Sequence, residues 1–217
     1  PRVQLNGLVG SNQTLGDDLV VSGLSGRTSY SIGQFHYETE GFRPNNDLTQ
    51  DTYSAFFQTQ LTYRSSLQLE LRHQDRENGD LAMLFDPGIF SPVNRREQRG
   101  DIIRLGYHLA PSASNDLLVS LISNQADLDQ NISEVVGELF PGAPVTRNEQ
   151  STESADGYTA EIQYLARLRR MDYIVGVGFH QQDFSLIGSV VESAPGFPPL
   201  FEETLDSTRD EKHPNTY

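Results

Sequence analysis

The sequence has 217 residues and contains neither cysteine nor tryptophan. Without cysteine, no disulfide and no thiolate chemistry is available to this chain. No stretch approaches the roughly 18 apolar residues of a membrane helix, and only 36% of the residues are hydrophobic. Basic residues are scarce, with 16 Lys and Arg against 30 Asp and Glu, which gives a net charge of −14. Because nucleic acid binds to basic stripes, we expect no nucleic-acid partner.

A period of two residues is the main pattern that is present. In "YTAEIQYLARLRRMDYIVGVGFH" (158–180), apolar side chains occupy alternate positions on both sides of "RRM" (169–171). Such alternation predicts two β-strands joined by a tight turn, each with one apolar face. No helical pattern of 3.6 residues persists elsewhere, so the predicted class is all-β.

The same reading predicts nine strands over the whole chain. The connections between them alternate in length, which is typical of an antiparallel up-and-down meander with its tight hairpin turns at one end. The strands are expected at 2–10, 18–25, 29–40, 51–63, 67–77, 101–110, 117–127, 157–168 and 172–186. The short connections are 25–28, 64–66, 111–116 and 169–171, and the long loops are 41–50, 78–100, 128–156 and 187–217.

The acidic charge is concentrated in two of these long loops. Residues 127–156 hold seven acids and one base, and residues 187–217 hold six acids and two bases. We expect both segments to be solvated and to lie on the same side of the molecule. Residues 1–217 are expected to form one β-barrel domain or part of one, and the start at Pro1 without a leader indicates a mature or excised piece.

Alternation alone does not separate a membrane barrel from a soluble β-sandwich. Three features favour the membrane. The clearest strands run for 10 to 13 residues, whereas soluble strands usually hold about 5–6 and tilted membrane strands need about 9–11. Tyrosines such as Tyr53 and Tyr173 flank the apolar faces, and short turns oppose long acidic loops. The absence of tryptophan favours the soluble alternative, an extracellular adhesin or binding module.

The membrane interpretation predicts what each face of a strand contacts. Polar residues are predicted to face a hydrated interior: Gln58, Gln60, Glu70, Arg72, Arg104, His108, Glu161 and Gln163. Residues on the other alternate positions are predicted to face lipid: Tyr53, Phe57, Leu61, Tyr63, Leu69, Leu105, Tyr107, Ile162, Tyr164, Val175 and Val177. Because single-chain barrels close with an even number of strands, nine strands imply a barrel completed by residues outside this chain or by partner subunits.

One stretch carries a resemblance to a known class. The run 33–87, and chiefly "GFRPNNDLTQD" (41–51), resembles the C-terminal barrel region of large Gram-negative outer-membrane surface proteins that carry tetratricopeptide repeats. The resemblance implies an outer-membrane location and a pore, surface-anchoring or export role. It carries no catalytic residue to this sequence.

Residues capable of catalysis or metal binding are present but scattered. His36, His73, His108, His180 and His213 show no metal-ligand spacing. No local motif singles out a nucleophile. We therefore expect neither an enzyme nor a bound metal or cofactor. "NNDLTQD" (45–51) offers oxygen ligands but lacks the glycine and terminal glutamate of a calcium loop.

Three long loops carry clusters of proline, glycine and phenylalanine, namely "FDPGIFSP" (85–92), "LFPGAP" (139–144) and "APGFPPLF" (194–201). Solvated loops do not need large apolar rings, and such a cluster left in water promotes association. We expect the loops to fold over one another, or onto a partner subunit, through Phe85, Phe90, Phe140, Phe197 and Phe201.

Overall fold

The computed structural model of the protein describes residues 1–82 and 90–216, with side chains described as far as Lys212 in the last strand. The described part of the chain is built from β-strands, and no helix there has the length and hydrophobicity of a membrane span. The ten strands are β1 (Arg2–Val9), β2 (Leu15–Ser25), β3 (Thr28–Thr39), β4 (Leu48–Thr62), β5 (Ser65–Asn78), β6 (Arg95–Ser112), β7 (Asn115–Phe140), β8 (Ala143–Leu168), β9 (Met171–Ser193) and β10 (Phe201–Thr216).

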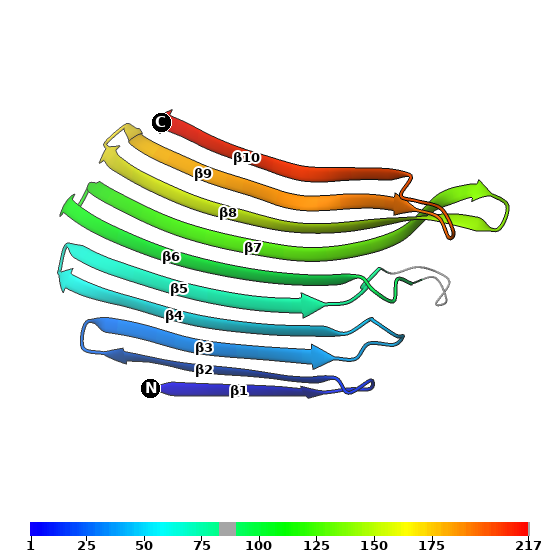
Figure 1. Ribbon diagram of the computed structural model, residues 1–217. Coiled ribbons are helices and arrows are strands. Elements are labelled where there is room, and N and C mark those ends of the chain that lie inside the picture. The colour runs from blue at the N-terminus through cyan, green and yellow to red at the C-terminus, as the bar shows by residue number, and fades with distance from the viewer. Residues whose placement is uncertain (83–89, 217) are drawn as a thin grey trace.

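All ten strands form one antiparallel sheet in sequence order, from β1 at one edge to β10 at the other. The sheet is curved and open, and the two ends of the chain lie on its two outer strands (Figure 1). The predicted all-β, up-and-down meander is therefore confirmed. Within the described residues, β1 and β10 are each paired on one side only, so the sheet has two free edges.

The four predicted tight turns all lie at one end of the sheet (Figure 1). Between β2 and β3 only Gly26 and Arg27 remain outside the strands, and Gly26 has a φ of +59° that a residue with a side chain rarely adopts. The connections between β3 and β4 and between β5 and β6 lie at the opposite end.

The prediction of a solvated loop at 128–156 is wrong. Strands β7 and β8 run on through this segment as a hairpin of 26 residues on each side, joined only by Pro141 and Gly142. The hairpin extends past the rest of the sheet (Figure 1). Its acidic and hydroxyl side chains lie on both faces, so the sequence lacks apolar alternation there although the backbone ladder continues.

The prediction of nine strands is also wrong, because residues 201–216 form a tenth strand inside the loop predicted at 187–217. Strand β9 extends to Ser193, which leaves only 194–200 as the connection. The acidity of 201–211 and the presence of Pro214 conceal this strand in the sequence. Proline is tolerated in β10 because that strand lies at the edge of the sheet. Because ten is an even number, the strand count no longer argues for missing strands. The two free edges of the sheet remain as the structural argument for them.

The sheet has almost no dry interior of its own. Ala143 and Ala194 are the two buried apolar side chains among the described residues. By contrast Phe57, Ile162 and Val175 are 43%, 48% and 60% exposed. A soluble domain of this size would bury such side chains under a second layer.

Candidate membrane interface

The strand register sorts side chains onto two chemically different faces. One row that crosses six strands contains only apolar residues, and the next row, on the opposite face, contains only polar residues and glycine. The apolar row is Phe57, Leu69, Leu105, Leu121, Ala160 and Phe179. The polar row is Gln58, Gln68, Gly106, Ser120, Glu161 and Gly178. We call the face of the first row the outer face and that of the second row the inner face.

The residues predicted to face the interior all fall on the inner face, from Gln58 and Gln60 on β4 to Glu161 and Gln163 on β8. Those predicted to face lipid fall on the outer face, with two qualifications. Leu61 lies within a bulge between Gln60 and Thr62, and Tyr63 lies in the turn between β4 and β5. The register thus separates the two sets as alternation requires.

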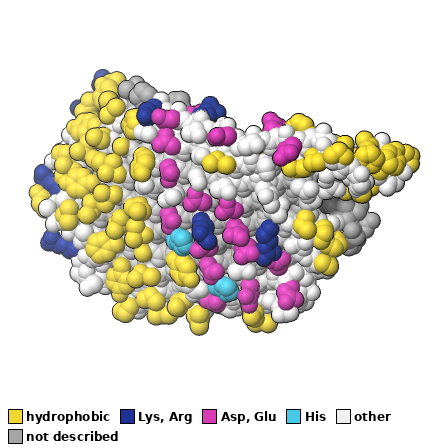
Figure 2. Space-filling view, viewed as in Figure 1, with side chains coloured by type: hydrophobic (Ala, Val, Ile, Leu, Met, Phe, Trp, Pro, Cys, Tyr) yellow, Lys and Arg dark blue, Asp and Glu magenta, His cyan; other side chains and the backbone are white. Residues whose placement is uncertain are grey.

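The apolar part of the outer face has a limited height, and we call it the apolar band. Stretches such as 103–109 on β6 and 173–179 on β9 span roughly 20–24 Å along their strands. Lipid-facing bands of outer-membrane barrels are about 25 Å tall and their strands tilt by about 35–45°, so a strand crosses such a band over about 30–35 Å of its own length. The apolar stretches of β6 and β9 cover about two thirds of that crossing. Figure 2 shows the hydrophobic side chains gathered at the end of the sheet that carries the tight turns.

Above the apolar band the outer face becomes acidic on every strand from β5 to β10. One cross-strand row contains His73, Asp101, Gln125, Asp156, Asp183 and Asp210, and these residues, with His36, Asp51, Asp75 and Arg99, form what we call the polar belt. Figure 2 shows this change across the middle of the face. Tyr53 lies at the border, where its ring stacks on that of His73 with 6.4 Å between centroids. Tyrosine favours the level at which hydrocarbon meets headgroups.

Two histidines of the polar belt are held by carboxylates. Nδ1 of His73 lies 2.8 Å from Oδ1 of Asp101, and its Nε2 lies 2.8 Å from Oδ2 of Asp75. The hydrogen bond with Asp101, followed by that with Asp75, raises the pKa of His73, which lies beyond the apolar band. His36 makes a corresponding contact of 2.7 Å with Asp51, and this hydrogen bond raises its pKa as well.

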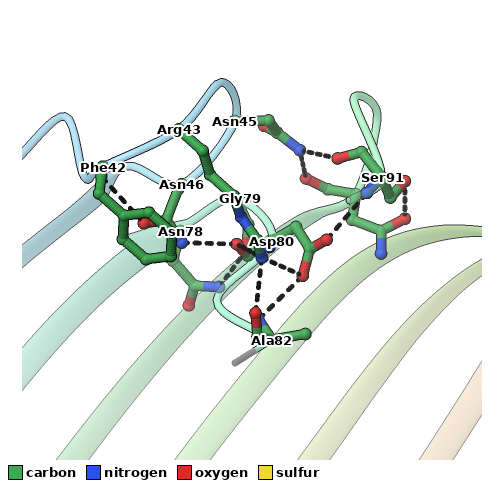
Figure 3. A network of polar contacts seen from close by, with 10 residues as sticks. Phe42, Arg43, Asn45, Asn46, Asn78, Gly79, Asp80, Ala82 and Ser91 are labelled. Atoms are coloured by element: carbon green, nitrogen blue, oxygen red, sulfur yellow. Dashed lines mark hydrogen bonds and ion pairs between the residues drawn. The ribbon is translucent and has the colours of Figure 1, made fainter. Parts of the chain in front are cut away.

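A buried polar network joins the two neighbouring connections at the loop end of the sheet (Figure 3). The Arg43 side chain is 3% exposed, and its Nη2 donates to the carbonyl of Ala82 at 2.6 Å and lies 3.5 Å from Oδ1 of Asp80. The Asp80 carboxylate accepts the backbone N–H groups of Ala82 and Ser91 at 2.9 and 2.8 Å. The guanidinium of Arg43 also lies 5.9 Å from the centre of the Phe90 ring.

Two consecutive asparagines complete this network. The amide of Asn46 donates to the carbonyl of Asp80 at 2.8 Å, and the amide of Asn45 donates to the carbonyls of Ser91 and Asn94 at 2.7 and 2.9 Å. "NNDLTQD" therefore supplies loop anchors in the described residues. The partners lie 34 to 49 positions apart in the sequence, so no local pattern could have revealed them.

The tip of the β7–β8 hairpin meets the connection between β9 and β10. The rings of Phe140 and Phe197 lie edge to face with 6.0 Å between centroids. The two buried alanines, Ala143 and Ala194, belong to the same two segments. Of the other phenylalanines predicted to make loop contacts, Phe90 contacts Arg43, Phe201 is 46% exposed at the start of β10, and Phe85 lies outside the described residues.

The ten-stranded sheet is similar to part of several solved structures. The siderophore receptor PiuA from Acinetobacter baumannii matches 97% of the chain at 10% identity with a TM-score of 0.76. FpvA of P. aeruginosa matches 99% at 12% identity and 0.67, and the ferric citrate transporter FecA matches 96% at 14% identity and 0.62. These proteins are outer-membrane β-barrel receptors, and the chain has the fold of part of their wall.

The matches cover 37%, 34% and 32% of those three receptor chains, so the protein described here spans about a third of their length. No family model and no curated protein matches the sequence.

Proposed function

We propose that the chain forms part of the wall of an outer-membrane β-barrel that acts as a pore, or as the surface-anchoring or export component of a larger protein. The observation that carries this proposal is the apolar band, which crosses the sheet on one face and ends at one level. An apolar band that no second layer of the described structure covers is suited to contact with membrane lipid. The polar inner face then lines a hydrated interior.

The two free edges support a barrel with further strands. Inside a bilayer every backbone N–H and C=O group needs a partner, so β1 and β10 could not remain unpaired there. We propose that strands outside these 217 residues, or from partner subunits, pair with both edges. The chain covers about a third of the length of the similar receptors, which is consistent with a barrel that has further strands.

The names of the similar proteins favour transport over a purely structural role. They are called a siderophore receptor and a ferric citrate transporter. We carry over the transport class and not their ligands. The resemblance to barrels of tetratricopeptide-repeat proteins remains a prediction, as does the absence of catalysis.

Detergent dependence separates this proposal from the alternative of a soluble adhesin. The full-length protein that contains this chain should need detergent to stay monodisperse. When reconstituted into a planar lipid bilayer, it should conduct ions. A full-length protein that stays monodisperse in buffer without detergent contradicts the membrane location.

A further inference from the structure

Three arginines on the inner face of β5 and β6 lack a carboxylate partner. Among the described residues, no carboxylate lies within 4 Å of the guanidinium groups of Arg72, Arg76 or Arg96. Their neighbours on the outer face differ, since Arg95 bonds Asp47 and Glu77, and Arg99 pairs with Asp75 at 3.4 Å. In a chain with a net charge of −14, cations without acidic partners need an explanation.

Two of these arginines share a hollow at the loop end of the inner face. Arg76 pairs in register with Gln98, and Arg96 pairs with Asn78, so the two arginines are diagonal neighbours on adjacent strands. Diagonal neighbours lie about 7–8 Å apart, within reach of long side chains. The hollow has a volume of about 310 Å³, and its lining includes Arg76, Arg96, Asn78 and Gln98.

Two of the arginines that line this hollow keep unused hydrogen-bond donors in the described structure. Nε of Arg76 is buried and has no hydrogen-bond partner in the described structure, and a buried N–H group normally has one. Among the described residues, the Arg96 side chain makes one hydrogen bond, from Nη2 to Oε1 of Gln130 at 3.1 Å. The one carboxylate in the lining, Asp80, already accepts two backbone N–H groups and lies beside Arg43. Arg95, which also contributes, is held by Asp47 and Glu77.

A second hollow continues this donor surface along the inner face. It has a volume of about 320 Å³ and is lined by Arg72, Gln74, Gln98 and Asn124, among others. Gly100 lies opposite Gln74 in the register and has no side chain to fill the space. Arginine and amide donors therefore extend from the loop end toward the middle of the wall.

We propose that the hollow between Arg76 and Arg96 binds an oxyanion, namely a phosphate, sulfate or carboxylate group, inside the barrel. A guanidinium group presents two parallel N–H donors to such a group, and two guanidinium groups can hold it from two sides. The position of the site inside a barrel rests on the proposed function, whereas its donor chemistry rests on the inner face itself. The oxyanion is either a free inorganic ion or a group on a larger solute.

Calorimetric titration of the full-length protein in detergent at low salt tests this site. The probes are inorganic phosphate and glucose 6-phosphate. Arg76→Gln and Arg96→Gln should each weaken binding by about tenfold or more, because each removes a charged hydrogen-bond partner. Arg96→Lys, which keeps the charge but not the paired donors, should fall between these variants and the unaltered protein.

Arg99→Gln is the matched control, because it removes the same charge from the outer face of the same strand and should leave binding unchanged. Tighter binding of glucose 6-phosphate supports a group on a larger solute, and equal binding of both probes supports a free oxyanion. Absence of binding by either probe, unchanged affinity in both glutamine variants, or an equal loss in Arg99→Gln overturns the proposal. These readouts differ from detergent dependence, so the oxyanion site and the membrane location can fail separately.

Discussion

At the scale of single residues, the two faces of β8 make opposite demands. Ile162 lies within the apolar band on the outer face, and Gln163 lies next to it on the inner face. Ile162→Arg should destabilise the barrel in lipid by about 2–4 kcal/mol, because a charge then faces hydrocarbon near the midplane. Gln163→Arg, the matched control, should cost much less because its side chain faces water. Unfolding by urea in lipid vesicles measures both variants, and an equal tolerance of arginine at the two positions contradicts the assignment of the faces.

The carboxylates around His73 lead to a prediction about pH. The pKa of His73 is raised in the folded protein, chiefly by the hydrogen bond with Asp101. The contribution of this contact to stability is therefore fully present below the unfolded pKa of about 6.5, and it is lost as the pH rises through the higher folded pKa. An NMR titration of the His73 ring should show a midpoint above 6.5, and Asp101→Asn should lower it. A midpoint that Asp101→Asn leaves unchanged shows that this contact does not form in solution.

The Arg43–Asp80 pair is a further residue-scale case, because both partners are buried. Asp80→Ala should remove one ion-pair partner of the buried Arg43 and leave two backbone N–H groups without their acceptor. We expect a loss of about 2 kcal/mol or more, with faster hydrogen exchange at Ala82 and Ser91. The control is Asp129→Asn, since Asp129 accepts its bond from Thr152 at an exposed position. Equal exchange at Ala82 and Ser91 in the two variants would show that the network does not hold these loops.

At the scale of elements, the sequence predicts strands where one face is apolar and misses them where both faces are polar. Strands β4, β5, β6 and β9 were predictable because an apolar face enforces a period of two. The upper halves of β7 and β8 lie above the apolar band, so neither of their faces has to be apolar and no period of two appears in the sequence. Strand β10 is concealed for the same reason and by Pro214. The faces of individual residues follow from the same alternation, whereas the loop network depends on contacts between distant segments and was not predictable.

The β7–β8 hairpin also yields a prediction at this scale. Phe140 at its tip packs against Phe197 of the next connection. A double-mutant cycle with Phe140→Ala and Phe197→Ala should give a coupling free energy of about 0.5–1.5 kcal/mol, which is typical of an edge-to-face pair. Either single variant should also make residues 139–144 more sensitive to protease. Additive effects of the two substitutions, with unchanged proteolysis, would show that the two loops are independent.

At the scale of the whole molecule, the proposed membrane location depends on the direction in which the apolar band faces. The polar belt lies above it on the same face, the inner face behind it is polar, and both edges of the sheet are free. A barrel wall in a bilayer would explain these features together, because lipid would cover the band, water would cover the belt and the interior, and further strands would pair with the edges.

An accessibility scan along β6 tests this claim most directly. These 217 residues contain no cysteine, so single cysteines introduced at positions 102 to 107 can each carry a nitroxide label, in a full-length protein from which any cysteine elsewhere has been removed. The labelled protein is measured in lipid vesicles. We expect oxygen, which dissolves in lipid, to relax the labels at 103, 105 and 107 most strongly. A water-soluble nickel chelate should instead reach those at 102, 104 and 106. Equal access of the nickel chelate to both sets would contradict a lipid-facing outer surface.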